Sequence, residues 1–230
     1  MLNVLCLKYG TKYSADYVNK LYNMTQRHLT IPHRFVCFTE DSTGLDTNIE
    51  TKSLPYDSSI KGWWWKTYLF NKDNFPAGDV NLFFDLDIVI VNNIDKLADC
   101  TGAFLGFEDP GKIYSRTSKL NSSVMRWRSG EYSNIWETYL NDRRQAHGLH
   151  GDQDWIWRLH QNTITFYPDK WIQSYKWQVR SHSDLHRIGV IQQFKEVKNP
   201  EIDPETSVLV FHGTPNPEHV EDPVIVDNWR

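Results

Sequence analysis

Apolar residues recur along this chain in short continuous runs and in stripes at helical spacing. Short runs rich in Val, Ile and Phe are typical of strands buried on both faces of a sheet. Stripes that repeat every three to four residues predict helices packed on such a sheet. The predicted strands are residues 3–7, 34–39, 48–54, 80–94, 102–109, 121–127, 163–167 and 207–211, and the predicted helices are 14–29, 62–71, a short one within 92–99, 134–144 and one that opens at Gly151 and Asp152.

The first three elements are a strand, a helix and a second strand, an order that favours a right-handed crossover between parallel strands. We therefore predict an α/β fold, and 230 residues are enough for one such domain. Ligands of open α/β sheets bind beyond the carboxyl ends of the strands. The loop after the first strand carries Tyr9 and Tyr13, which could stack there on a nucleobase, although tyrosines at a surface turn need no ligand.

Two acids, Asp85 and Asp87, interrupt the apolar run 80–94. Residues two apart in a strand point to the same face, so we expect the two carboxylates to crowd together in a buried place. Such a pair must either take up a proton or bind a cation. The sequence thus predicts a metal site at this strand. The alternative is that the acids simply close the strand at a polar turn.

Three adjacent tryptophans, Trp63 to Trp65, stand in the predicted helix 62–71. Neighbouring residues on a helix cannot share one face, so at least one indole must turn away from the main core and be covered by something else. Lys66 follows them directly. A lysine on a helix is usually solvated, but near paired acids it would meet anionic groups.

Asp152, Gln153 and Asp154 stand in the first turn of a predicted helix, where exposed N–H groups favour carboxylates. That preference explains one acid but not two acids and a glutamine together. His212 follows the last apolar strand. Combined with the acid pair, it makes an oxygen-rich set with one imidazole, which suits Mn²⁺ or Mg²⁺ better than zinc.

The composition excludes several classes of protein. With 40% hydrophobic residues and a net charge of -4, neither disorder nor a broad electrostatic grip on nucleic acid is indicated. The opening residues have too short an apolar run for a secretory signal, and no stretch approaches the length of a membrane span, so we expect a soluble, cytoplasmic protein. Cys6, Cys37 and Cys100 fit reduced structural thiols.

The order of motifs resembles the family-8 type of GT-A glycosyltransferase, the relatives of glycogenin and of bacterial galactosyltransferases. The matching segments are KYGTKY at 8–13, Lys66, FFDLD at 83–87, NSS at 121–123, HGDQD at 150–154 and FHGTPNP at 211–217. The resemblance implies a GT-A, Rossmann-like fold with a mixed, mostly parallel sheet flanked by helices. It also implies transfer of a sugar from a nucleotide diphosphate, with UDP as the expected nucleotide, to a glycan or other hydroxyl acceptor, with retention of configuration.

The resemblance also implies roles for individual residues. Mn²⁺ or Mg²⁺ would be held by Asp85, Asp87 and His212, and the reacting carbon would lie near Asp152, Gln153 and Asp154. The donor would be bound by Leu7, Tyr9, Tyr13, Lys66, Asp85, Leu86, Asn121, Ser122, His212 and Gly213.

The ending departs from the family pattern. Gly213 follows His212 directly, and Asn216 stands where the family has a lysine, so a phosphate contact from this loop is in doubt.

The sequence is also compatible with two other functions. An apolar run ending in Asp-x-Asp also occurs in haloacid-dehalogenase-type phosphohydrolases, and Val89 matches their pattern, but that motif normally lies near the start of the chain. A non-catalytic carbohydrate-binding protein could also use the many aromatic residues.

Overall fold

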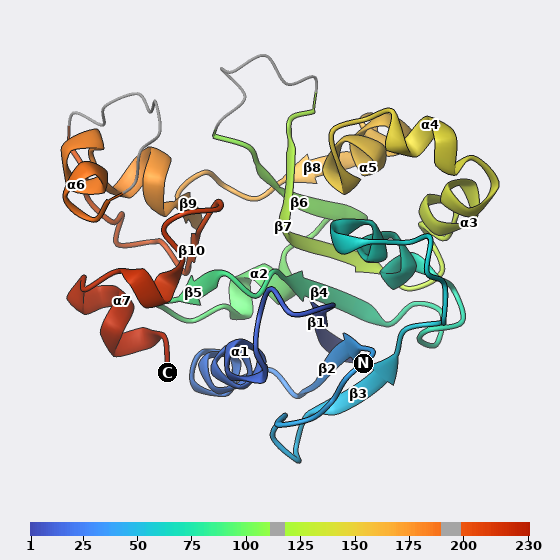
Figure 1. Cartoon of the computed structure of the whole chain (residues 1–230), viewed down its shortest axis with the longest axis horizontal. Helices are drawn as coiled ribbons and strands as arrows, with labels where there is room; N and C mark the ends of the chain where they lie inside the picture. The colour runs from blue at the N-terminus through green and yellow to red at the C-terminus, as the bar shows by residue number, and fades with distance from the viewer. Residues whose placement is uncertain (111–117, 190–198) are drawn as a thin grey trace.

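A computed structural model of the chain describes residues 1–110, 118–189 and 199–230. At its centre is a seven-stranded sheet with the order β3-β2-β1-β4-β7-β6-β8 (Figure 1). Neighbouring strands are parallel except where β7 pairs with β4 and β6, so the predicted mixed, mostly parallel sheet is confirmed. The strands are β1 Leu2–Lys8, β2 His33–Thr39, β3 Glu50–Ser53, β4 Val80–Phe84, β6 Phe104–Glu108, β7 Leu120–Arg128 and β8 Ile164–Phe166.

A second, three-stranded sheet has the order β5-β10-β9 and consists of Ile88–Ile90, Val208–Val210 and Ile172–Ser174. The prediction of one continuous strand over 80–94 was therefore wrong. Asp85 to Asp87 form a turn between β4 and β5, which belong to different sheets. Two carboxylates are costly inside a sheet, and the turn places them at its edge instead. Residues 169–180 are aromatic and basic without clean periodicity, which predicts irregular structure, but they contain β9 and a π-helix at Tyr175–Val179.

Helices cover both faces of the central sheet. The predicted helix 134–144 is divided at Asp142, whose carboxylate accepts a hydrogen bond from the Gln145 N–H at 3.0 Å and so caps the second part. The stretch after Lys61 is a 3₁₀-helix rather than an α-helix. The helices are α1 Ala15–His28, η1 Gly62–Phe70, α2 Asp95–Asp99, α3 Asn134–Asn141, α4 Arg143–His147, α5 Asp152–His160, α6 His182–Arg187, η4 Pro217–His219 and α7 Pro223–Asn228.

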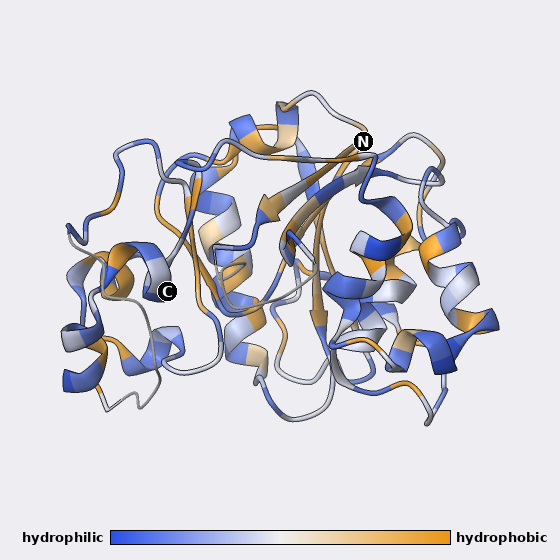
Figure 2. Ribbon diagram, turned by 90° about the horizontal axis from the view of Figure 1, so that it is seen from above, coloured by the Kyte–Doolittle hydropathy of each residue, from blue (hydrophilic) through white to orange (hydrophobic). Residues whose placement is uncertain are grey.

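The strands alternate their side chains between two hydrophobic clusters. Val4 and Cys6 of β1 join the cluster that includes α1 and the small sheet, whereas Leu5 joins the cluster that includes η1, α3 and α5. In β4, Phe83 faces the second cluster and its neighbours on either side face the first. Figure 2 shows the apolar strands running between helices on both sides. Burial on both faces explains why the strands are largely apolar, and among their buried polar residues the side chain of Asn3 in β1 donates to that of Asn81 in β4 at 2.8 Å.

The three cysteines are free thiols, as predicted. Cys6 and Cys37 lie opposite each other on β1 and β2, and both are fully buried. Burial raises the pKa of the Cys6 thiol well above its usual value, and the neighbouring Cys37 raises it further. The Cys6 thiol is therefore not activated as a nucleophile, because the thiolate is the reactive form.

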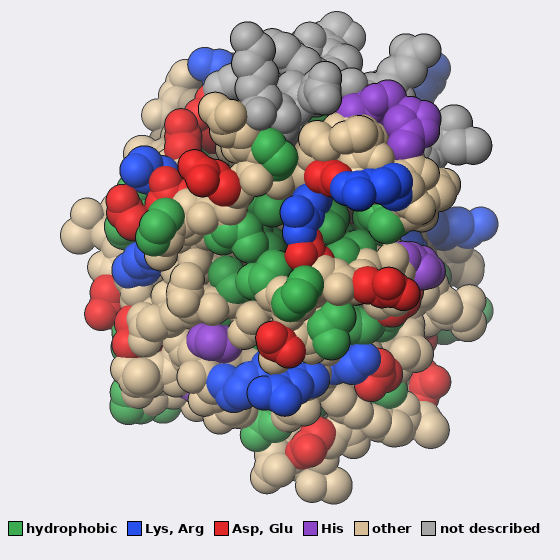
Figure 3. Space-filling model, turned by 90° about the vertical axis from the view of Figure 1, so that its left-hand side faces the viewer, with side chains coloured by type: hydrophobic (Ala, Val, Ile, Leu, Met, Phe, Trp, Pro, Cys, Tyr) green, Lys and Arg blue, Asp and Glu red, His purple; other side chains and the backbone are tan. Residues whose placement is uncertain are grey.

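On the face that carries α6 and α7, Figure 3 shows hydrophobic side chains gathered near the centre, with charged side chains of both signs interspersed around them. This face therefore has no large area of uniform positive charge of the kind that binds nucleic acid.

None of the helices in the described ranges has the length and apolar character needed to cross a bilayer.

Candidate active site

A cavity of about 570 Å³ lies at the carboxyl ends of β1 and β4. Because β7 runs antiparallel to β4, its first residues lie at the same edge, and the Asp85 N–H donates to the Ser123 carbonyl at 2.9 Å. The polar start of β7 and the polar end of β4 thus meet. The lining residues are Leu7, Tyr9, Lys12, Tyr13, Gly62, Trp63, Lys66, Asp85, Asp87, Asn121, Ser122, Ser123, His150, Gly151, Asp152, Gln153, Phe211, His212 and Gly213.

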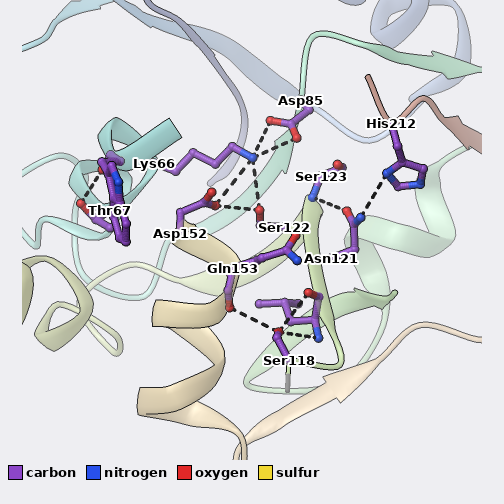
Figure 4. A network of polar contacts seen from close by, with 12 residues as sticks. Lys66, Thr67, Asp85, Ser118, Asn121, Ser122, Ser123, Asp152, Gln153 and His212 are labelled. Carbon is purple, nitrogen blue, oxygen red and sulfur yellow. Dashed lines mark hydrogen bonds and ion pairs between the residues drawn. The ribbon is translucent and has the colours of Figure 1, made fainter. Parts of the chain in front are cut away.

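Lys66 is the centre of a polar network in this cavity (Figure 4). Its ammonium lies 2.8 and 2.9 Å from the two carboxylate oxygens of Asp85 and 3.7 Å from Oδ2 of Asp152. It also donates to Ser122 Oγ at 3.2 Å, and Ser122 in turn donates to Asp152 Oδ2 at 2.7 Å. Lys66 comes from η1, Asp85 from the end of β4, Ser122 from β7 and Asp152 from α5. One side chain therefore ties together four elements far apart in the sequence.

Burial and charge act in opposite directions on Lys66. Burial alone would lower its pKa, but the carboxylates of Asp152 and Asp85 outweigh this and raise the pKa above the usual value, so the amine is charged at neutral pH. Burial raises the pKa of Asp152, while Lys66 and the hydrogen bond from Ser122 hold it down. The network thus keeps a nearly buried carboxylate beside a permanent positive charge.

Asp87 lies beside Asp85 in the turn and is also buried. Burial, followed by the negative charge of Asp85, raises its pKa to about 6. The Tyr13 hydroxyl donates to Asp87 Oδ2 at 2.8 Å and, with the charges of Lys12 and Lys66, partly offsets this increase. At neutral pH the ionised form of Asp87 is therefore energetically unfavourable, and a bound cation would reduce this cost.

Replacing Asp87 by asparagine is expected to stabilise the ligand-free protein at pH 7.5 by about 1–3 kcal/mol. A carboxyl whose folded-state pKa is raised adds stability below its unfolded pKa and loses that contribution as pH rises through its folded pKa. The advantage of Asp87→Asn should therefore be full above pH 6 and shrink as pH falls towards 4. The measurement is urea unfolding at a series of pH values in the presence of a chelator.

The control for this experiment is Asp227→Asn, which changes an exposed acid on α7. Its free energy of unfolding at pH 7.5 should match that of the wild type. If Asp87→Asn is the less stable protein at pH 7.5, the electrostatic account of this carboxylate is wrong.

β10 brings His212 to the same place. It pairs with β5, and the Phe211 N–H donates to the main-chain carbonyl of Asp87 at 3.1 Å. His212 then lies with Nδ1 3.4 Å from the side-chain amide of Asn121 (Figure 4). Gly213 has φ of +64°, a conformation open to glycine, and turns the chain along the cavity wall. Residues 87 and 212 are thus neighbours because two short strands pair.

The three predicted metal ligands line one cavity, but they do not form a ready coordination sphere. Among the described residues, no group of three or more His, Cys, Asp or Glu side chains is arranged to hold a metal ion. Both oxygens of Asp85 face Lys66, and Asp87 accepts from Tyr13. The donor set of two carboxylates and an imidazole still fits Mn²⁺ or Mg²⁺ in chemical type. Ligation of an ion by Asp85 would require its carboxylate to share or leave the contact with Lys66.

Most of the site residues predicted from the sequence lie together. Leu86 and Asp154 do not line the cavity. Leu86 is 2% exposed, and its side chain belongs to the hydrophobic cluster around α1. Asp152, Gln153 and Asp154 are consecutive on α5, where successive side chains point about 100° apart. The helix can therefore present the first two to the cavity but not all three.

Several lining residues were not predicted as site residues, although some stand inside the quoted motifs. Lys12 lies within KYGTKY, Ser123 within NSS, and His150 and Gly151 within HGDQD. Trp63 was recognised only as one of three crowded indoles. For the residues inside motifs, their position next to predicted site residues was the one sequence feature that could have identified them. The polar, turn-rich sequence of 108–119 predicts a mobile surface loop that could act as a lid, but its residues 111–117 lie outside the described residues.

Several solved structures are similar to this protein over most of its length. A galactosyltransferase, LgtC, in complex with donor and acceptor sugar analogs, aligns with a TM-score of 0.65 over 99% of this chain and 96% of its own, at 10% identity. An active-site mutant of LgtC aligns with a TM-score of 0.65 over 95% of this chain and 90% of its own, at 12% identity. The chain has the GT-A glycosyltransferase fold. A second GT-A protein, the glycosyltransferase GlyE of Streptococcus pneumoniae TIGR4, gives a TM-score of 0.65 at 10% identity.

The two GT-A proteins differ in length relative to this chain. The alignment covers 94% of the chain but 56% of GlyE, so the chain spans little more than half of that protein. No family model and no curated protein matches the sequence. The GT-A fold is therefore established by structure, while membership of family 8 remains a prediction from the order of the motifs.

Proposed function

We propose that the protein is a metal-dependent glycosyltransferase that moves a sugar from a nucleotide diphosphate, with UDP expected, to a hydroxyl acceptor with retention of configuration. The observation that carries this proposal is the network of Lys66, Asp85, Ser122 and Asp152 beside Asp87 and His212 in one cavity of a GT-A fold. The likeness to LgtC and GlyE supports glycosyl transfer as the reaction class.

The charges of the cavity support the need for a metal. Its lining holds three carboxylates, Asp85, Asp87 and Asp152, against the two ammonium groups of Lys12 and Lys66. An anionic nucleotide diphosphate would be repelled by this excess of negative charge unless a cation bound with it. Asp85, Asp87 and His212 would hold Mn²⁺ or Mg²⁺, which would supply Lewis-acid stabilisation of the diphosphate leaving group.

Lys66 is proposed to orient the donor sugar and the carboxylate of Asp152. It is charged, nearly buried and held by three partners, so its position costs little to organise when substrate binds. Lys12 lines the nucleotide end and is proposed to contact a phosphate, the contact left in doubt by Asn216. Asn121 and Ser122 would hydrogen-bond the sugar from the start of β7.

Gln153 is proposed to face the reacting carbon together with Asp152. Its Nε2 atom is buried, and among the described residues it has no hydrogen-bond partner. A buried donor without a partner costs about 1–3 kcal/mol, which suggests that a ligand completes this group. Carboxylate and amide oxygens at this place would stabilise positive charge developing at the anomeric carbon.

The nucleotide is proposed to bind along the loop after β1. Leu7, Tyr9 and Tyr13 line this end of the cavity. The ring of Tyr9 is held by Trp65, with centroids 5.8 Å apart. Tyr13 is fixed by its hydrogen bond to Asp87, so its position couples the base end to the proposed metal site.

Thermal-shift measurements with nucleotide sugars, with and without Mn²⁺, test the proposal. A ligand that binds only the folded state stabilises it by about 2.7 kcal/mol at a hundredfold excess over Kd, which for a chain of this size corresponds to a rise in Tm of about 5–10 °C. We expect this rise with UDP-sugar plus Mn²⁺ and little change with either alone, because each alone leaves unbalanced charge in the cavity.

Three outcomes would contradict the proposal. The full rise in Tm with the sugar nucleotide in the presence of a chelator would mean that no metal is needed for donor binding. Release of phosphate from a phosphate ester, with no sugar transferred, would favour a phosphohydrolase. Glycan binding that needs neither nucleotide nor metal would favour a carbohydrate-binding protein.

A further inference from the structure

The three adjacent tryptophans of η1 have three different surroundings. Trp65 is 2% exposed and belongs to the hydrophobic cluster under the helix. Trp64 is stacked on Tyr139 of α3, with ring centroids 5.5 Å apart and an interplanar angle of 13°. Trp63 is 56% exposed and belongs to neither hydrophobic cluster. The expectation that one indole turns away from the core is confirmed, and the protein itself covers only part of Trp63.

Trp63 lines the cavity next to the start of α5. A Cβ atom at Gly151 would lie 3.4 Å from Nε1 of Trp63 and 3.7 Å from its Cδ1, so the pyrrole edge of the indole rests against this glycine. Gly151 directly precedes Asp152 and Gln153 in the chain. The exposed indole is therefore anchored one residue away from the two groups proposed to face the reacting carbon.

The depth of the lining residues distinguishes two positions in the cavity. The side chains of Lys66 and Asp152 are 10% and 7% exposed and form its inner end. Trp63 is far more exposed and therefore lies towards the opening. A donor sugar held by Lys66 and Asp152 would fill the inner end, and the second substrate would then have to approach from the opening, across Trp63.

We propose that the indole of Trp63 is the platform on which a sugar ring of the acceptor stacks, so that the acceptor is itself a glycoside. This inference rests on the proposed transferase function. The face of an indole is flat and apolar and carries partial negative charge, which suits the C–H-rich face of a pyranose ring. A ring held there would place its hydroxyl group beside Asp152 and Gln153.

Kinetics of Trp63→Ala separate the two substrates. We expect KM for a glycoside acceptor to rise about tenfold, the loss that corresponds to one aromatic contact, while KM for the sugar nucleotide changes less than about twofold. Trp63→Phe should retain most of the affinity because it keeps a ring face. Trp63→Leu should behave like the alanine variant, because it keeps an apolar side chain without that face.

A binding measurement tests the same point without turnover. The probes are methyl glycosides of glucose, galactose and N-acetylglucosamine, with UDP and Mn²⁺ present, followed by saturation-transfer NMR. We expect contact with at least one glycoside in the wild type, loss of it in Trp63→Ala and retention in Trp63→Phe. The matched control is Tyr56→Ala, which removes an aromatic ring that is 98% exposed and does not line the cavity, and which should bind as the wild type does.

The outcomes separate this inference from the proposed function. An increase in KM for the donor instead of the acceptor, or equal losses in Trp63→Ala and Tyr56→Ala, would overturn the assignment of Trp63 to the acceptor. Unchanged kinetics in an active Trp63→Ala protein would overturn it as well. A wild-type protein that neither transfers nor releases sugar from any nucleotide sugar would instead reject the transferase itself.

Discussion

Replacing Asp87 by alanine is expected to lower kcat/KM for sugar transfer at least about a hundredfold while the protein stays folded. The proposed metal would stabilise the leaving diphosphate, and Asp87 is the carboxylate of the pair that is not paired with Lys66. Folding should not suffer, since burial and Asp85 already make the ionised form of Asp87 unfavourable. The measurement is steady-state transfer from a UDP-sugar at saturating Mn²⁺, with circular dichroism to confirm the fold.

A second readout tests metal binding directly. Calorimetry with Mn²⁺ in the presence of UDP should show uptake in the wild type and not in Asp87→Ala. The control is Asp16→Ala, which removes an acid on the outer side of α1 whose side chain is 60% exposed, and which should transfer and bind Mn²⁺ normally. If Asp87→Ala transfers sugar as fast as the wild type does, Asp87 is not a ligand of a catalytic metal.

Replacing Lys66 by methionine is expected to have the largest effect on stability, a loss of about 3–5 kcal/mol at neutral pH. The change leaves Asp152 buried and Asp85 partly buried without the ammonium that balances both. Without Lys66 the pKa of Asp152 should rise further, so the loss should be present at neutral pH and diminish as pH falls through that raised pKa. The measurement is urea unfolding at neutral and acidic pH.

A double variant identifies the cause of this loss. Adding Asp152→Asn to Lys66→Met should recover part of the stability, because one of the unbalanced charges is gone. The matched control is Lys170→Met, which breaks an ion pair to Asp203 at the surface, where the lysine is 61% exposed, and should change stability by less than about 1 kcal/mol. Equal losses in the two lysine variants would mean that burial of the network contributes nothing.

The Lys66 network also explains how the cavity can exist before any ligand binds. Three carboxylates around one opening would repel one another, and Lys66 reduces that repulsion by contacting two of them. Asp87 is left with the least compensation, as its raised pKa indicates. A cation bound at Asp87 would therefore neutralise the negative charge that Lys66 leaves uncompensated.

Sequence patterns alone predicted the α/β class of the fold and most residues that line the candidate site. Apolar runs identified the strands of the central sheet, because burial on both faces leaves mainly apolar side chains in a strand such as β4, where Asn81 is the one polar residue. The polar groups that follow or precede those runs pointed to the cavity, because ligands bind at strand ends in this class of fold. The acid pair, the start of β7 and His212 were found in this way, whereas the beginning of α5 was found because two acids and a glutamine share one helical turn.

How these groups meet depends on contacts between distant parts of the chain. Alternation along a strand predicted that Asp85 and Asp87 share a face, but pairing of β5 with β10 pulls the chain into a second sheet and makes a turn of them. The same pairing joins Phe211 to the main chain of Asp87, a hydrogen bond across 124 residues that no local pattern encodes, and so carries His212 to the acid pair. The rotation of α5 admits Asp152 and Gln153 and leaves Asp154 out, and the packing of η1 leaves Trp63 at the opening. Local patterns specify burial, whereas the direction of a side chain depends on which distant element packs beside it.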